Sequence, residues 1–392
     1  MYTYVHSADI STRLQVEHGI TEMCYNVDLV GLMLRQAEKQ ARGDGGIPLD
    51  QLLAMQTSAP VGFAIEARVY AEVPSRDFAP SPGLLQFVEW HQTSGSRVDT
   101  WITSGTNISP FYDPMIAKVM VWDETSHDGA VDQMLEMLRY SKVQGCPTNF
   151  QYLSAIVSSP GFREGDTTTA FLTSSHMKFV PQTIDVISGG AYSTIQDLPA
   201  RLGVGHGVPE SGPLDSVSFR LANVLVGNHE NTEALEITLM GPELLFNIPA
   251  VIAVTGGKIS CSINGEPVET NSTLVVPANS TVKLGVVSSG CRSYLAVKGG
   301  FPNIPLYLGS KSTTTTLKLG GYQGRQLVAN DSLDLNERST TWAESATILS
   351  VPAEARLDRL WSSSWSIYVM PGPHDDPEFL TDDGESFVTL LR

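Results

Sequence analysis

The sequence lacks several features that would place it in a special class of protein. No run of 18 apolar residues occurs, so no transmembrane helix is predicted. The first nine residues have neither the basic start nor the apolar core of a signal peptide. Only four of the 392 residues are cysteine and none forms a Cys-x-x-Cys pair, so neither a zinc site nor a disulfide framework is expected. This composition favours a globular protein in a reducing compartment, and we expect a cytoplasmic location.

Basic residues are also scarce. The chain has 25 Lys and Arg against 42 Asp and Glu, which gives a formal net charge of −17. Nucleic acids and anionic membranes attract clustered Lys and Arg, so we expect neither as a partner. A small anion held by one or two local arginines remains compatible with this charge.

The length predicts two or three domains, and the pattern of residues changes along the chain. The first part mixes helices and strands. Asp28 is expected to cap a helix that ends at Arg42-Gly43, and Asp128 a second helix that Gly145 stops. The second helix would bury Val131, Met134, Leu135 and Leu138. Strands are expected over 61–73 and 115–122, so the predicted fold class is α+β.

From about residue 184 onward short β-branched runs replace the helical patterns. Asn264-Gly265 predicts a hairpin, because both residues adopt positive φ readily. Further strands are expected over 274–277, 282–287 and 294–297. One helix, 215–225, would interrupt them, with one apolar side made of Val217, Leu221, Val224 and Leu225.

The densest polar cluster is the run from Arg13 to His18. On an extended strand Arg13, Gln15 and Glu17 would share one face, where they could hold a small anion with Glu17 as a base. The alternative is the solvated face of an edge strand. Glu66 and Arg68 repeat the spacing, and there the alternative is an ion pair along a strand.

Longer motifs around these residues resemble known families. STRLQVEHGITEM and VDLVGLMLRQA resemble the end of the ATP-grasp domain of biotin carboxylases. AIEARVYAE, FAPSPGLL and SPFYDPMIAKVMVW resemble the biotin carboxylase C-terminal domain. YSTIQDLPARLGVGHGVPESGPLDSVSFRLANVLVGNHENTEALEITLMGPEL, LGSKST and LGGYQGRQL resemble the carboxyltransferase domain of the urea carboxylase and urea amidolyase family, also called the allophanate hydrolase subunit 2 family.

The resemblance implies an order of domains. Residues 1–60 would end an ATP-grasp domain, and residues 61–176 would form a biotin carboxylase C-terminal domain of mixed helices and antiparallel strands. Residues 184–392 would form a mainly β carboxyltransferase domain with a cyclophilin-like barrel. Both outer domains are expected to be incomplete.

The resemblance also implies roles for individual residues. Arg13 and Gln15 would hold bicarbonate, Glu17 would deprotonate it, and Arg68 would steady the enolate form of biotin. Asp9 stands where the family usually has a Glu that binds Mg²⁺, and its side chain is one methylene shorter. The implied cofactors are ATP, Mg²⁺ and biotin, the last on a carrier domain that this sequence does not contain.

Polar residues in Gly- and Pro-rich segments are the candidates for the carboxyltransferase site. They are His206, Ser211, Asp215, Asn223 and Glu236. The alternative is a rigid loop followed by a helix that Asp215 caps.

We therefore expect part of a biotin-dependent urea carboxylase, a ligase that makes allophanate from ATP, bicarbonate and urea through carboxybiotin. It would be inactive alone, since the ATP-holding segment is not in the sequence. A non-catalytic remnant or incomplete gene model is the second interpretation. A carboxyltransferase-like binding module of the 5-oxoprolinase type is the third, and the fused biotin carboxylase segment argues against it. Assembly of several copies is left open.

Overall fold

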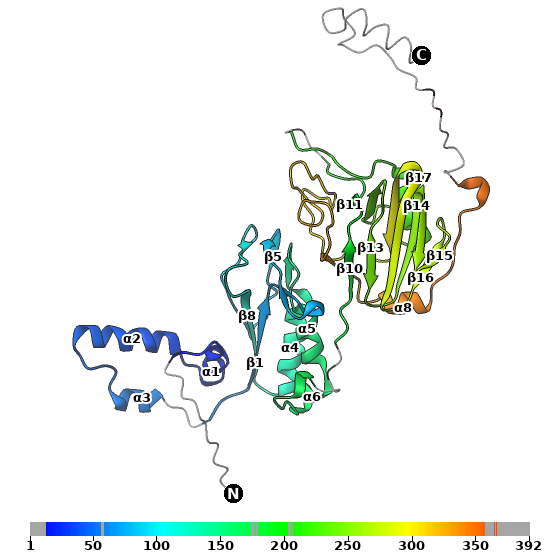
Figure 1. Cartoon of the computed structure of the whole chain (residues 1–392). Coiled ribbons are helices and arrows are strands. Elements are labelled where there is room, and N and C mark those ends of the chain that lie inside the picture. Colours follow the sequence, from blue (N-terminus) through cyan, green and yellow to red (C-terminus); the bar gives the residue numbers. More distant parts are fainter. Residues whose placement is uncertain are drawn as a thin grey trace, which may run out of the picture.

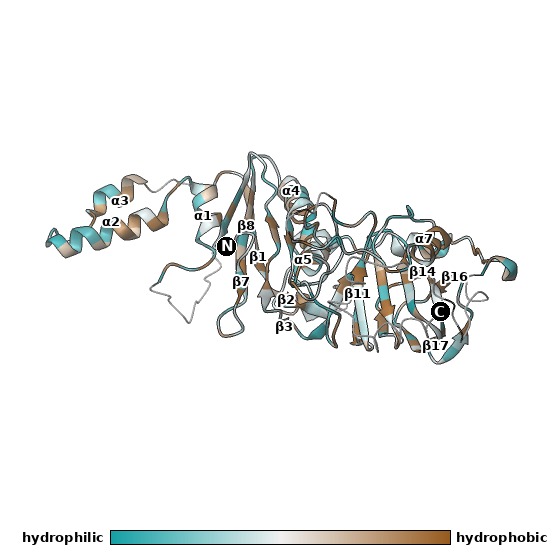
Figure 2. Cartoon of the chain, turned by 90° about the horizontal axis from the view of Figure 1, so that it is seen from above, coloured by the Kyte–Doolittle hydropathy of each residue, from teal (hydrophilic) through white to brown (hydrophobic). Residues whose placement is uncertain are grey.

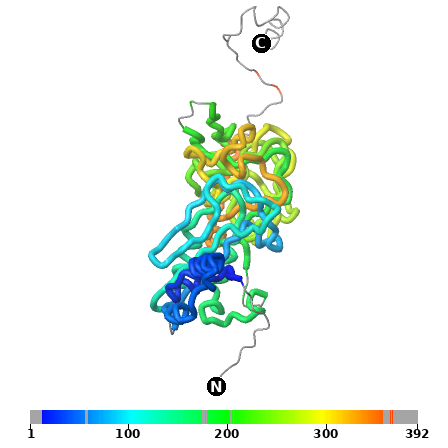
Figure 3. The backbone as a smooth tube through the Cα atoms, turned by 90° about the vertical axis from the view of Figure 1, so that its left-hand side faces the viewer, coloured from blue at the N-terminus to red at the C-terminus, as the bar shows by residue number. Residues whose placement is uncertain are grey.

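The structure is a computed structural model that describes residues 13–55, 59–173, 179–202 and 207–356, together with 177, 205, 364 and 366. Its helices are α1 (His18–Tyr25), α2 (Leu29–Arg42), α3 (Leu49–Met55), α4 (His127–Tyr140), α5 (Phe150–Ser158), α6 (Pro160–Glu164), α7 (Ser216–Leu225) and α8 (Ser339–Glu344), with 3-10 turns at Pro74–Arg76, Phe171–Thr173 and Ala353–Ala355. Helices α1 to α3 lie at one end, a mixed part in the middle and a β-rich part at the other end (Figures 1 and 3).

The strands divide between these two parts. The mixed part contains β1 (Phe63–Tyr70), β2 (Glu72–Val73), β3 (Ala79–Pro80), β4 (Gly83–Leu84), β5 (Phe87–Glu89), β6 (Ser96–Thr100), β7 (Asn107–Ile108), β8 (Met115–Asp123) and β9 (Lys142–Gln144). The β-rich part contains β10 (Thr183–Ser188), β11 (Tyr192–Gln196), β12 (Ala234–Thr238), β13 (Glu243–Phe246), β14 (Ala250–Ile263), β15 (Glu266–Val268), β16 (Thr273–Val276), β17 (Ser280–Val297) and β18 (Ser332–Asp334).

The mixed part is built on a three-stranded antiparallel sheet in the order β1-β8-β6. Alternate residues of β1 face opposite sides, as the sequence predicts. Ile65, Ala67 and Val69 are buried in a core that includes one face of α4. Glu66 and Arg68 lie on the other face, and the register puts Arg68 opposite Lys118 on β8. Helix α1 packs against β1 and β8.

Two helices before residue 184 were predicted, α2 and α4, and the prediction for α4 needs correction at both ends. Asp28 does cap α2, since its Oδ1 accepts from the Gly31 N–H at 2.7 Å, and the helix ends at Gly43 with φ 82°. The cap of α4 is Ser126, not Asp128: the Ser126 Oγ accepts from the Gly129 N–H at 2.9 Å. Asp128 instead lies in the first turn, where its charge favours the positive end of the helix.

The prediction that Gly145 stops α4 is also wrong. The helix ends at Tyr140, and β9 pairs with β5 before the glycine is reached. At the far end of the molecule α2 and α3 extend away from the mixed part (Figure 2). No residue of either helix is buried.

The β-rich part is one antiparallel sheet of nine strands. The predicted strands 282–287 and 294–297 belong to the single strand β17, which pairs with β12, β13 and β14. The hairpin is confirmed: Asn264 and Gly265 have φ 53° and 85°, and Ile263 pairs with Glu266. The fold is therefore α+β, with a mainly β second part.

Helix α7 covers this sheet with a face that matches the predicted one only in part: Leu225 is buried and Leu221 packs against the core, as expected. Val217 and Val224 are exposed, whereas Phe219, Ala222 and Leu225 are buried against β14 and β17. The Phe219 ring lies 5.9 Å from the Tyr294 ring, edge to face. Phenylalanine and alanine fit the close helix–sheet contact, so they displace the valines to the solvent side. Of the described helices, none has the length and apolar character needed to cross a bilayer.

Candidate functional site

The segment that contains Arg13, Gln15 and Glu17 is not the strand that its alternation predicts. It runs irregularly into a turn at Val16–Glu17, and α1 begins at His18. Helix formation from His18 onward excludes the expected strand, and no described strand pairs with the segment. All three side chains are nevertheless exposed beside α1.

Glu17 and Arg68 lie together although 51 residues separate them in the sequence. Glu17 is the N-cap of α1, but its carboxylate makes no capping bond and instead pairs with the Arg68 guanidinium. The two side chains are 48% and 36% exposed, so the pair contributes little stability and stays accessible to a ligand. The Arg68 Nε also lies 3.8 Å from Glu66 Oε1.

Behind this pair the sheet and α1 together carry a ring of polar and charged side chains, of which the sequence analysis singled out only Glu66. Its links join Glu66, Lys118, Asp99, Arg97, Glu22 and His18, at distances from 2.6 to 3.9 Å. The alternating polar residues of β6 and the lysine within apolar β8 are the signals that could have revealed it.

Burial acts differently on the carboxyls of this ring. The Glu66 side chain is 5% exposed and neither oxygen has a hydrogen bond, so burial raises the pKa of Glu66 although Lys118 opposes this. Burial would also raise the pKa of Glu22, but hydrogen bonds from Arg97, the Leu29 N–H and His18 outweigh it and lower that pKa.

Two of the predicted site residues, Asp9 and His206, lie outside the described residues. The described part of the chain contains no group of three or more His, Cys, Asp or Glu that could hold a metal ion.

Of the carboxyltransferase candidates, three come together and one lies apart. Glu236 on β12 accepts from the Leu214 N–H at 2.7 Å and from the Tyr294 O–H at 2.8 Å. Tyr294 in turn accepts from the Asp215 N–H at 2.7 Å, and the Ser211 Oγ donates to the Thr313 carbonyl. The loop of residues 207–215 is thus fastened to the sheet.

Asp215 and Asn223 have structural partners. Asp215 caps α7, as the alternative interpretation predicts, since its Oδ1 accepts from the Val217 and Ser218 N–H groups. Asn223 is fully buried; its Nδ2 donates to the Thr232 carbonyl at 2.7 Å and its Oδ1 accepts from Asn228. Asn223 therefore has no open path to a ligand.

Arg201 is a further residue near this loop that the sequence analysis missed. Its side chain has no exposed surface, and its Nη1 donates to Thr314 Oγ1 at 2.7 Å. The guanidinium also donates to the Ser312 carbonyl, and no carboxylate pairs with it among the described residues. Burial lowers the pKa of Arg201.

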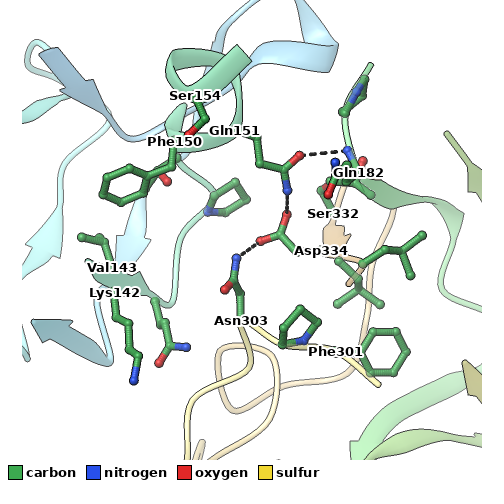
Figure 4. Close-up of a pocket in the computed structure, with 18 of the residues that line it drawn as sticks. Lys142, Val143, Phe150, Gln151, Ser154, Gln182, Phe301, Asn303, Ser332 and Asp334 are labelled. Carbon is green, nitrogen blue, oxygen red and sulfur yellow. Dashed lines mark hydrogen bonds between the residues drawn. The ribbon is translucent and has the colours of Figure 1, made fainter. Parts of the chain in front are cut away.

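A cavity of about 970 Å³ lies between the mixed part and the β-rich part (Figure 4). At its wall Gln151 of α5 donates to Asp334 Oδ1 at 2.9 Å, and Asn303 donates to the other oxygen. Gln151 Oε1 accepts from the Gln182 N–H at 2.8 Å. None of the predicted site residues lines this cavity.

Comparison with known proteins gives two family matches. The "Biotin carboxylase C-terminal domain" model matches residues 66–174, and the "Carboxyltransferase domain, subdomain A and B" model matches residues 206–389. A protein of Emericella nidulans named "Putative urea carboxylase" is 49% identical over 94% of this chain and 29% of its own length. The urea amidolyase of Saccharomyces cerevisiae is 40% identical over 95% of this chain and 20% of its own length.

A solved structure agrees with these matches. The urea carboxylase of Kluyveromyces lactis superimposes with a TM-score of 0.75 at 43% identity, over 83% of this chain and 28% of that one. The chain spans between a fifth and three tenths of the length of these relatives. Both domain models agree with the similarity that extends over nearly all of this chain. The chain belongs to the urea carboxylase and urea amidolyase family.

Proposed function

We propose that this chain is part of a biotin-dependent urea carboxylase, which joins bicarbonate to urea and forms allophanate with ATP hydrolysis. The observation that carries the proposal is the accessible Glu17–Arg68 pair, which the fold forms from two distant motifs. A base and a cation at one exposed position suit a reaction that deprotonates bicarbonate and then stabilises a developing oxyanion. The relatives support the same activity.

Each residue of the site has a defined task in this proposal. Arg13 and Gln15 bind the bicarbonate anion, and the Glu17 carboxylate takes the proton of its hydroxyl group. Arg68 is released from Glu17 when that carboxyl becomes neutral, so its guanidinium can stabilise the enolate oxygen of biotin. When bound, ATP supplies the phosphoryl group that activates bicarbonate, and biotin carries the carboxyl group to urea.

The exposed pair fits an anionic substrate and the ureido ring of biotin, because neither side chain needs to leave a buried position. In the same proposal, Asp9 would bind Mg²⁺.

For the second half of the reaction we propose the loop of residues 207–215 with Glu236, within a domain of the cyclophilin-like barrel type spanning 184–392. Ser211 and Asp215 supply polar groups there. We also propose that the first domain ends at residue 60 and the second at residue 176, and that several copies of the chain assemble.

The test uses a chimera in which residues 13–356 replace the matching segment of the Kluyveromyces lactis urea carboxylase. Glu17→Gln should lower bicarbonate-dependent ATP cleavage by about 10²-fold to 10⁴-fold, because the base is lost. Arg68→Ala should lower biotin carboxylation by about 10²-fold or more. Both variants should retain transfer from biotin carboxylated beforehand to urea.

The matched control is an exposed ion pair of the same kind on α2. Glu38 and Arg42 are 56% and 68% exposed and lie 2.5 Å apart, so Glu38→Gln and Arg42→Ala should leave both partial reactions unchanged. Near-normal bicarbonate-dependent ATP cleavage in Glu17→Gln would refute the proposed role.

A further inference from the structure

The Lys118 side chain of β8 reaches back to the loop that carries Glu17. Its side chain is only 11% exposed. Its Nζ donates to the Val16 carbonyl at 2.8 Å, across 102 residues of sequence. Val16 directly precedes Glu17, so this bond fixes the backbone at the point where the irregular segment turns into α1.

The surroundings of the ammonium group hold it in that position. Nζ lies 3.4 Å from Asp99 Oδ2, 3.9 Å from Glu66 Oε2 and 3.3 Å from His18 Nε2. Two carboxylates compensate the buried charge, and their placement on β6 and β1 limits where the lysine can point. The other ring nitrogen of His18 lies 3.1 Å from Glu22 Oε2, on the side of the ring away from Lys118.

Few other contacts hold the segment. Within the described part of the chain, residues 13–17 receive side-chain bonds from the rest of the protein at two places, Val16 from Lys118 and Glu17 from Arg68. The second bond involves exposed groups that the reaction itself would separate. During such a step the Lys118–Val16 bond is the contact that remains.

We propose that Lys118 is a positioning residue that keeps the 13–17 segment in its bicarbonate-binding conformation; this role rests on the proposed function. Without the bond, the segment would populate that conformation only for a fraction of the time. Bicarbonate would then bind with an apparent affinity reduced by that fraction, while the bound complex would still contain Glu17 and Arg68 in place. The apparent affinity for bicarbonate should therefore fall, whereas kcat should stay the same.

The kinetic test is Lys118→Met in the same chimera. KM for bicarbonate should rise by about ten-fold or more, with kcat within about two-fold of the parent. A lysine that only stabilised the fold would give the opposite result, a lower maximal rate with an unchanged KM. Lys142→Met is the matched control, because Lys142 is 59% exposed and does not contact this site, and its KM should equal that of the parent.

A second variant covers the case in which Lys118→Met folds poorly, since that substitution removes one of the two cations beside the buried Glu66 carboxylate. Lys118→Met combined with Glu66→Gln removes both charges and should show the same rise in KM. An unchanged KM for bicarbonate in the folded single or double variant would overturn the proposal.

Hydrogen exchange on the isolated 392-residue chain tests the tether independently of activity. In Lys118→Met the His18 amide, which donates to the Gln15 carbonyl, should exchange about ten-fold faster or more than in the parent and in Lys142→Met. Unchanged exchange would overturn the tether, even if the chimera were active. Failure of the proposed function would show differently, as a parent chimera without bicarbonate-dependent ATP cleavage.

Discussion

Asp334 should make the folded protein less stable as the pH rises from about 4 to about 7. Burial beside the cavity raises its pKa from 3.8 to about 6, the charge of Asp185 adds to this, and the hydrogen bond from Asn303 opposes it. The change that tests this is Asp334→Asn, which keeps the shape of the side chain and removes its titration.

The sign follows from proton binding. Between pH 3.8 and about 6 the folded state holds a proton on Asp334 that the unfolded chain has lost. The free energy of unfolding therefore falls as the pH rises through this window. A shift of about two pKa units corresponds to ~3 kcal/mol. Asp334 keeps some contact with solvent through the cavity, which reduces that figure, so we expect a change of ~1 to 2.5 kcal/mol between about pH 4 and about pH 7.

The assay is guanidinium chloride unfolding of the parent and of Asp334→Asn at both pH values. Because all other groups titrate equally in the two proteins, the difference between them isolates Asp334. The free energy of unfolding of the variant minus that of the parent should increase by ~1 to 2.5 kcal/mol as the pH rises. Glu337→Gln is the control, because Glu337 lines the same cavity, its side chain is 59% exposed and its substitution leaves Asp334 in place. If this difference in free energy of unfolding stays constant with pH, or decreases as the pH rises, the reasoning is refuted.

Two further predictions concern buried groups. Phe219→Ala should lower the free energy of unfolding by ~3 to 5 kcal/mol, because the ring is fully buried between α7 and the sheet; guanidinium chloride unfolding measures it, and a loss below ~1 kcal/mol would contradict the assigned helix face. Burial raises the pKa of the Cys146 and Cys261 thiols to about 12 and about 11, whereas Cys291 is exposed. A disulfide reagent at about pH 8 should therefore modify Cys291 in the native protein and the two buried thiols only after unfolding, and mass spectrometry of the peptides would show early labelling of Cys146 if this is wrong.

Local signals in the sequence predicted the elements whose ends are fixed by neighbouring residues. Asp28 and Gly43 bound α2, and Asn264-Gly265 forms its hairpin, since cap and turn geometry depend on a few adjacent positions. The face of α7 could not be obtained in this way. Its apolar residues occupy more than one side of the helix, and buried Asn223 is tolerated only because Thr232 and Asn228 bind it.

The candidate site shows the same division. The motifs around Glu17 and Arg68 predicted which residue types the site contains, but alternation predicted a strand where the chain turns into α1. Lys118 stands out as a lysine within an apolar strand, but that local pattern does not identify the group that it contacts. Its importance arises from the Val16 carbonyl, and only the tertiary structure brings the two together.

The long strand β17 has a consequence for how the protein is made. It is hydrogen-bonded to β12 through its end near Tyr294, to β13 through its beginning near Ser280, and to β14 along most of its length. Each of these three strands therefore lacks its neighbour on one edge until residue 297 has left the ribosome. Until then β12, β13 and β14 expose apolar residues and unpaired backbone groups on the nascent chain. Pauses in translation before residue 297 would prolong that exposure. Chaperones that bind nascent chains would then bind the exposed strands β12, β13 and β14.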